Sequence, residues 1–212
     1  MGKALIEIHY LPSIEYFCLL LLHKEIVIEK HENYQKQTYR NRCYINTANG
    51  TQALTVPITE KHGKVLIKDA RIDHSMNWVN THWRAILSAY GKSPFFEHYA
   101  DELQDILYSK EIFLYDLDHK LLSFCLQCLG VSIVLTESTE YQKTVLDEVT
   151  DFRSTITPKI PFFERSFYEP APYIQVFGSK FVTNLSLMDL LFCEGPNAIH
   201  VLQSSTKGYL NK

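Results

Sequence analysis

The densest group of polar side chains in this chain lies in the stretch HENYQKQTYRNR, residues 31–42. It directly follows EIVIE, whose alternation of β-branched and charged residues predicts a strand. Loops at the carboxyl ends of strands build the ligand sites of open α/β sheets, so this loop is the first candidate site. His31 is a candidate base, because imidazole titrates near neutral pH, and the neighbouring cations and amides can hold carboxylate, phosphate or sugar hydroxyls. The candidate binding residues are Asn33, Lys36, Arg40, Asn41 and Arg42, and the competing interpretation is a solvated loop.

A second group lies on one face of a helix that the stretch NWVNTHWRAILSAY, residues 77–90, predicts. Trp78 and His82 are one helical turn apart, and Tyr90 continues the same stripe. His82 is therefore a candidate general base in an aromatic wall, with Trp78 and Tyr90 as candidate substrate contacts. A structural histidine that is hydrogen-bonded in the core is the alternative. The adjacent Asp73 and His74 have no third ligand nearby in the sequence, so no metal site is predicted.

The stretch TNLSLMDLLFCEGPNAI, residues 183–199, predicts a helix with a dense apolar surface. Asn184 or Ser186 can cap its start, and Gly195 followed by proline ends it. The apolar residues indicate a helix packed in the core. Asn184 and Asp189 are its unexplained polar residues, for which a cap or a buried hydrogen bond competes with a ligand-binding role.

The remaining pattern favours an α/β fold with a mixed sheet, helices mainly from the middle of the chain and a C-terminal core helix. We expect a single domain over residues 1–212, with an irregular crossing segment at about 141–172 that is rich in proline and aromatic residues. Asn49-Gly50 is a strong hairpin signal. The expected strands are 4–11, 25–31, the two arms of a hairpin over 43–58, 64–72 and 131–138; the expected helices are 13–23, 77–90, 95–109, 114–129 and the C-terminal helix.

Composition excludes several classes of function. A net charge of -3 and a pI near 6.3 give no general attraction to a phosphate backbone, so we expect no nucleic-acid partner. There is no apolar run of the roughly 18–20 residues that a membrane span needs, and no export signal, so the expected location is cytoplasmic. Cys125 and Cys128 form a CxxC inside a predicted helix, which indicates core packing rather than redox chemistry. The common dinucleotide, P-loop, hydrolase and zincin motifs are absent, and the sequence names no cofactor.

Several blocks of the sequence resemble the WbqC-like family of bacterial proteins. They are YLPSIEYF at residues 10–17, ENYQKQTYRNRCYI followed by ANGTQALTVPI, and NLSLMDLLFCEGP at residues 184–196. The middle of the chain is similar to the family's succession of Trp, His, Ile and Tyr that leads into a Pro-Phe element, carried here by Trp78, His82, Ile86, Tyr90, Pro94 and Phe95. The blocks follow one another in the family's order and touch most of the chain.

The resemblance implies a transferase in the biosynthesis of O-antigen or another bacterial surface polysaccharide. A glycyl or other acyl group would be transferred to an amino sugar, so the expected partner is an activated sugar. For that chemistry His82 or His31 would act as the base, and Lys36, Asn41 or Arg42 would bind the developing oxyanion or another anion. The alternative is a non-catalytic scaffold of the same fold that binds a sugar, a metabolite or another protein. An enzyme that activates nucleotides is a third reading.

One departure from the family pattern bears on catalysis. Many members begin with a strand that ends in His-Gln-Pro, and an ungapped match places Ile6, Glu7 and Ile8 at those positions. Glu15 stands where a glycine is usual. His9 lies nearby but out of register, so the role of the missing histidine is not transferred to it.

Overall fold

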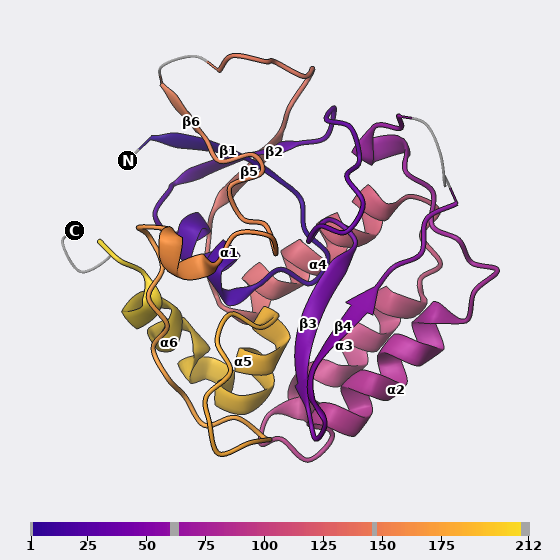
Figure 1. The fold of residues 1–212 in the computed structure, drawn as a ribbon, viewed down its shortest axis with the longest axis vertical. Coiled ribbons are helices and arrows are strands. Elements are labelled where there is room, and N and C mark those ends of the chain that lie inside the picture. The colour runs from indigo at the N-terminus through magenta and orange to yellow at the C-terminus, as the bar shows by residue number, and fades with distance from the viewer. Residues whose placement is uncertain (1, 60–63, 146–147, 209–212) are drawn as a thin grey trace.

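A computed structural model describes residues 2–59, 64–145 and 148–208 and contains a four-stranded sheet in which every neighbouring pair of strands is parallel (Figure 1). The predicted α/β class is confirmed. No described helix combines the length and the apolar composition that crossing a membrane requires. The strand order is β5-β2-β1-β6, with β1 at Lys3–Glu7, β2 at Glu25–Glu29, β5 at Val134–Glu137 and β6 at Val149–Asp151.

The two faces of the sheet differ in polarity at the carboxyl ends of its central strands. On one face Ala4, Ile6, Ile26 and Ile28 are fully buried in the main hydrophobic core. Successive residues of a strand point to opposite faces, so Glu7 and Glu29 belong to the other face. The register of β1 and β2 places these two glutamates directly beside each other. A pair of carboxylates therefore lies side by side at the carboxyl ends of the two central strands, where ligand sites are expected.

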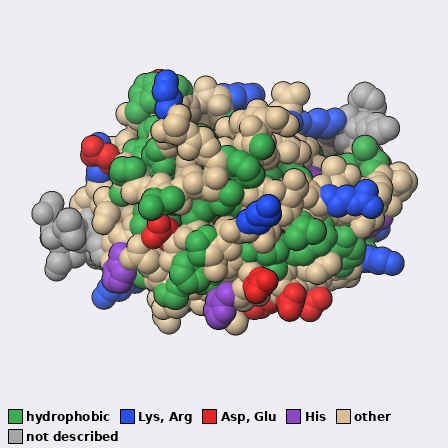
Figure 2. Space-filling model, turned by 90° about the horizontal axis from the view of Figure 1, so that it is seen from below, with side chains coloured by type: hydrophobic (Ala, Val, Ile, Leu, Met, Phe, Trp, Pro, Cys, Tyr) green, Lys and Arg blue, Asp and Glu red, His purple; other side chains and the backbone are tan. Residues whose placement is uncertain are grey.

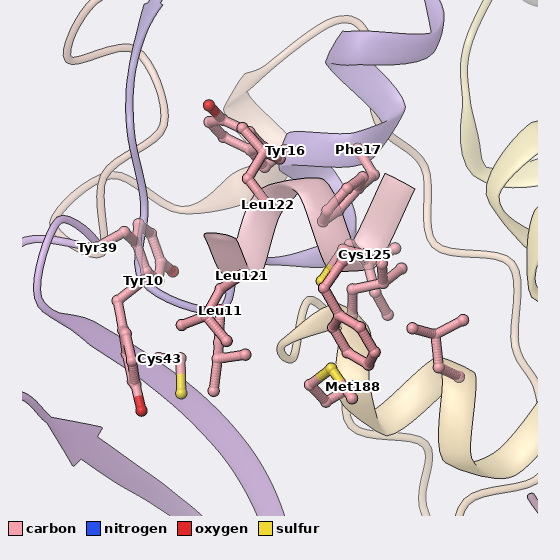
Figure 3. Packing of buried hydrophobic residues seen from close by; sticks show 14 of the residues in the cluster. Tyr10, Leu11, Tyr16, Phe17, Tyr39, Cys43, Leu121, Leu122, Cys125 and Met188 are labelled. Carbon is pink, nitrogen blue, oxygen red and sulfur yellow. The ribbon is translucent and has the colours of Figure 1, made fainter. Parts of the chain in front are cut away.

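All six α-helices of the described residues contribute side chains to the core. Figure 3 shows side chains of α1, α4 and α5 in one cluster, where Phe17, Cys125 and Met188 come from different helices. The predicted helices are confirmed, and the burial of Cys125 agrees with its predicted core role. The helix after Gly195 was not predicted. The helices are α1 Ile14–Leu21, α2 Trp78–Tyr90, α3 Phe96–Tyr108, α4 Leu114–Cys128, α5 Leu187–Glu194 and α6 Ala198–Ser205.

The ends of α5 follow from two residues. Ser186 is the N-cap, and its hydroxyl accepts a hydrogen bond from the Met188 backbone N–H. Gly195 ends the helix at a φ of 52°, where a side chain is disfavoured, and a Cβ built there would lie 2.4 Å from the ring of Phe95. The apolar run is therefore a core helix, as predicted, and its glycine is required for both conformation and space.

The antiparallel strands form a separate two-stranded hairpin of β3, Arg42–Thr47, and β4, Gly50–Thr55. Thr47 pairs with Gly50, so the loop consists of Ala48 and Asn49, one residue earlier than the Asn-Gly signal suggests. Gly50 has a φ of 97°, which explains why glycine stands at this position. The parallel strand pairs thus lie in the four-stranded sheet, and the antiparallel pair lies in this hairpin.

The prediction of a strand over residues 64–72 is wrong, because Ile67–Asp69 forms a 3₁₀ turn. Backbone groups of this segment bond to a loop instead of a neighbouring strand: the Ile67 N–H donates to the Glu32 carbonyl, and the Tyr34 N–H donates to the Val65 carbonyl. No ladder can form along it. Within the aromatic crossing segment the structure contains β6 and a second 3₁₀ turn at Phe162–Glu164, and a third follows α5 at Gly195–Asn197.

Candidate functional site

Buried charged side chains gather at the carboxyl ends of β1 and β2. Glu29 is fully buried and its carboxylate accepts hydrogen bonds from the Ser138 hydroxyl at 2.6 Å and from the His31 backbone N–H at 2.8 Å. The guanidinium of Arg153, from the segment after β6, lies 3.1 Å from the same carboxylate. Glu29 is therefore held by groups from three separate parts of the chain.

Glu7 occupies the neighbouring position and is also fully buried. Its carboxylate accepts a hydrogen bond from the Ser154 backbone N–H at 2.8 Å and lies 3.3 Å from Nε2 of His9. Because a carboxylate can only accept, the His9 Nε2–H donates to it. Arg40 approaches the same carboxylate at 3.6 Å.

Arg40 turns inward and is only 2% exposed. Its guanidinium makes a two-pronged contact with Glu32, at 2.6 and 2.7 Å, which is the geometry in which arginine binds carboxylates most tightly. We call Glu7, His9, Glu29, Glu32, Arg40 and Arg153 the carboxyl-edge cluster. It contains three carboxylates and two guanidinium groups in a region from which most solvent is excluded.

Burial and neighbouring charges shift the pKa values of this cluster. Burial raises the pKa of Glu7, but its hydrogen bond with His9 and the charge of Arg40 outweigh that effect, so the pKa is lowered overall. The pKa of His9 is lowered because burial disfavours the imidazolium, against the attraction of Glu7. Burial raises the pKa of Glu32 despite its bonds to Arg40. His9 is therefore a neutral imidazole beside an ionised Glu7 at neutral pH.

One ring nitrogen of His9 is unpaired. Its Nδ1 is buried and has no hydrogen-bond partner among the described residues, while Nε2 is bound to Glu7. The rings of Tyr16 and Tyr39 lie 4.7 and 5.4 Å from the imidazole ring, measured between centroids. Buried polar atoms are rarely left without a partner, so a free nitrogen on an oriented histidine marks a place where a substrate proton could be accepted.

A second buried ion pair lies on the far side of Tyr39. Arg165 binds the carboxylate of Glu15 through two nitrogens, and Asn184 donates to the same carboxylate at 2.9 Å. Tyr39, Arg165 and Asn184 line a cavity of about 280 Å³ between the hairpin and the aromatic crossing segment. Tyr39, 8% exposed, therefore lies between this cavity and His9.

The two histidines predicted as bases lie in different surroundings. His82 is buried on α2, with its Nδ1 2.9 Å from the Tyr10 hydroxyl and the ring of Trp78 5.1 Å away. Burial lowers its pKa to about 4, against a hydrogen bond to the Thr55 backbone. His31 is half-buried, and its Nδ1 lies 3.2 Å from the Ser138 hydroxyl. Among the described residues, the His31 and His82 side chains have no hydrogen-bond or ring-contact partner in common.

The loop residues predicted to bind substrate separate into two groups. Lys36, Asn41 and Arg42 line one shallow cavity of about 210 Å³, in which Asn41 donates to the Val56 carbonyl and Arg42 to the Thr55 hydroxyl. Arg40 instead belongs to the carboxyl-edge cluster. Asn33 is exposed, and its backbone pairs with Leu66.

Tyr90 and Asp189 belong to one buried hydrogen-bond network. Asp189 accepts from the hydroxyls of Tyr90 at 2.7 Å and Tyr173 at 2.5 Å, and from the Gln175 amide at 3.1 Å. Burial raises the pKa of Asp189 against these three bonds. Asn184 at the other end of this region binds Glu15, and Trp78 is buried with its indole nitrogen unpaired. The network ties α2 and α5 to the segment that precedes α5.

Sequence reasoning missed most of the carboxyl-edge cluster. Glutamate at positions 7 and 29 could have signalled a polar strand end, because a charged residue that continues a buried strand is costly unless it is paired. No comparable signal marks Arg153 or Arg165, which come from the irregular segment. No set of three or more His, Cys, Asp or Glu side chains that could hold a metal occurs within the described ranges.

The fold and this cluster define an α/β protein with buried charged side chains at the carboxyl ends of parallel strands. Residues 8–159 match the WbqC-like protein family, and the chain belongs to that family. It is 34% identical over 143 residues to the uncharacterised protein Rv1507c of Mycobacterium tuberculosis. This match covers 66% of the present chain and 61% of the relative, so the chain spans less than two thirds of that protein. No solved structure matches the chain.

Proposed function

We propose that this protein is a transferase of surface-polysaccharide biosynthesis that acylates the amine of an activated amino sugar, with glycine as the candidate acyl group. The observation that carries the proposal is the buried Glu7–His9 pair, in which one nitrogen of His9 is bound and the other is free. Membership in the WbqC-like family supports the class of reaction. The usual family histidine would stand at Ile6, three positions before His9, so the role of His9 is proposed from its own contacts and not from the family pattern.

The chemistry follows from the protonation state of His9. Glu7 holds the proton on Nε2, so the lone pair of Nδ1 is free to accept a proton from the sugar amine. The amine nitrogen forms a bond to the acyl carbon as that proton moves to His9, and the bond from the acyl carbon to the donor's leaving group breaks. Glu7 stabilises the imidazolium that results, as an oriented carboxylate does behind many catalytic histidines.

The cavity beside Tyr39 is the proposed location for the sugar. Arg165 and Asn184 face it with donors for hydroxyl or carbonyl oxygens, and the ring of Tyr39 separates it from the imidazole of His9. A displacement of Tyr39 would bring the sugar amine to Nδ1. His31 and His82 are the competing bases, although both of their Nδ1 atoms lie within hydrogen-bond distance of a hydroxyl.

The test is a transfer assay on purified protein with nucleotide-activated amino sugars and glycyl or other acyl donors, followed by mass spectrometry. We expect an acylated sugar with the wild type, loss of at least about a hundredfold in rate with His9→Gln, and a smaller change with His82→Gln or His31→Gln. Circular dichroism confirms that each variant is folded. Equal turnover by His9→Gln and wild type would exclude His9 as the base. Loss of turnover only in His31→Gln, or only in His82→Gln, would assign the base to that histidine instead.

A non-catalytic scaffold that binds a sugar or metabolite is the second candidate. The observation in its favour is that Arg40, Arg153 and Arg165 are each already bound by carboxylates of the chain itself. Internally paired cations stabilise the fold and leave little charge for a transition state. In that case a sugar nucleotide would bind His9→Gln and wild type equally well in calorimetry, and neither protein would form a product.

A further inference from the structure

A cavity of about 770 Å³, larger than the two described with the candidate site, lies away from the carboxyl-edge cluster. It is bounded by the loop of the β3–β4 hairpin, the C-terminal half of α2 and residues 176–177. In Figure 1 these elements meet at the lower end of the molecule, and Figure 2 views the molecule from that end. Basic side chains lie among hydrophobic ones on the face that it shows. The volume is in the range of pockets that enclose small organic ligands.

The charged side chains that line this cavity among the described residues have one sign. Arg84 and Lys92 line it, and its lining includes no aspartate or glutamate. Neither cation has an ion pair or hydrogen bond among the described residues, in contrast to Arg40, Arg153 and Arg165. Two unneutralised cations in one concave surface attract an anion more strongly than the same charges on a convex surface.

Buried hydrogen bonds hold the walls of the cavity in place. Asn46 of β3 donates from its side chain to the Phe177 carbonyl at 3.0 Å, and its backbone N–H donates to the Tyr90 hydroxyl at 3.1 Å. Tyr90 in turn donates to Asp189, which also binds Tyr173 of the same wall segment. The hairpin, α2 and the 173–182 segment are thereby fixed to one another. Asp189 and Tyr90 act here as positioning residues, and they do not line the cavity themselves.

The rest of the lining combines polar and apolar groups. Asn49, Gln52 and Ser88 offer amides and a hydroxyl, while Leu87 and Phe177 offer apolar surface. Leu87 is 48% exposed. Amides and hydroxyls suit the hydroxyl groups of a sugar or the edge of a base, and the cations suit phosphate.

We propose that this cavity binds a phosphate-bearing small molecule, with the phosphate held between Arg84 and Lys92 and the remainder directed to Asn49 and Gln52. The source of the phosphate is either a sugar phosphate or a nucleoside diphosphate, which share this anionic chemistry. The inference does not depend on the proposed transfer reaction, because none of the cavity residues belongs to the carboxyl-edge cluster.

The experiment is isothermal titration calorimetry of the full chain with inorganic pyrophosphate, glucose 1-phosphate and uridine diphosphate as separate probes. We expect binding of at least one probe, weakened about tenfold or more by Arg84→Gln and by Lys92→Gln, since each substitution removes a charge-assisted contact. Lys24→Gln is the charge-matched control variant, because Lys24 is exposed and lies outside this cavity. His9→Gln should bind as the wild type does.

The order of affinities identifies the source: uridine diphosphate binding tighter than pyrophosphate indicates a nucleotide, and glucose 1-phosphate binding tightest indicates a sugar phosphate. Lys92 also lies just beyond the C-terminal end of α2, where a cation favours the helix dipole without any ligand. If dipole compensation is its whole role, no probe will bind at millimolar concentration. That result overturns the proposal, as does equal weakening in the control variant or an unchanged affinity in Arg84→Gln and Lys92→Gln.

Discussion

Replacing Arg40 with methionine tests whether the carboxyl-edge cluster stabilises the fold through paired charges. Arg40 is 2% exposed, bonds Glu32 at 2.6 and 2.7 Å and lies 3.6 Å from Glu7. Methionine preserves much of the volume but leaves both carboxylates without their cation. Breaking a buried pair on one side costs about 3–5 kcal/mol, because an uncompensated charge remains in a region of low dielectric constant.

That loss is a large part of the roughly 5–15 kcal/mol by which domains are stable, so a milder variant is needed beside it. Arg40→Lys keeps the charge but loses the planar fork, and we expect it to cost about 1–2 kcal/mol. Adding Glu32→Gln to Arg40→Met removes one of the unpaired charges. The double variant should therefore recover at least about 1 kcal/mol relative to Arg40→Met alone.

The effect of Arg40→Met should depend on pH in a defined direction. Glu32 has a raised pKa in the folded state, so its charged form destabilises the fold above that pKa, and the penalty is relieved as the pH falls. Glu7 has a lowered pKa, so the wild type gains stability from it above the unfolded pKa and loses that stability as the pH falls. Arg40 lowers the pKa of both carboxylates. Both effects make the difference in unfolding free energy between the wild type and Arg40→Met smaller at pH 5 than at pH 7.

The assay is urea unfolding followed by the fluorescence of the two tryptophans, at pH 7 and pH 5, for the wild type and the three variants. A loss below about 1 kcal/mol for Arg40→Met at pH 7 would show that the pair contributes little to stability. A gap of equal size at both pH values would refute the argument that the unpaired carboxylates cause the loss.

Three further predictions concern other parts of the chain. Burial lowers the pKa of His82 to about 4, so the unfolded state takes up a proton on this histidine at a higher pH than the folded state does. Between pH 7 and pH 5 the wild type should therefore lose about 2 kcal/mol of unfolding free energy relative to His82→Gln, measured by urea unfolding. Parallel plots of stability against pH for the two proteins would contradict this. Gly195→Ala should lower the unfolding free energy by at least about 2 kcal/mol, since the added Cβ would strike Phe95. Gly130→Ala, also at positive φ but in open space, should lower it by only about 1 kcal/mol in the same urea unfolding experiment. Equal losses would exclude a steric cause. Burial raises the pKa of all five thiols, so Ellman's reagent should react slowly with the native protein and rapidly after unfolding. Of the five cysteines, Cys128 alone is partly exposed. Rapid labelling of any other thiol in the native protein would be inconsistent with the structure.

The elements with strong local signals could be predicted from the sequence. Helical spacing and a following glycine located α2 and α4, and Ser186 and Gly195 set the ends of α5 through contacts within a few residues. The segment at 64–72 shows where this approach fails. Its apolar spacing suits a strand, but whether a strand forms depends on a neighbouring strand to pair with, and the structure supplies loops there instead.

The sequence alone therefore determined the α/β class, the positions of every α-helix before α6, and the family, because those properties depend on periodicity, caps and contiguous motifs. Only the tertiary structure decided which charges meet. Arg153 reaches Glu29 across 124 residues and Arg165 reaches Glu15 across 150, through a segment without periodicity. The polar loop after β2 was predicted as the binding surface, yet its Arg40 points into the protein. A charged side chain is buried only where an oppositely charged partner lies beside it, and the path of the whole chain decides where that partner lies.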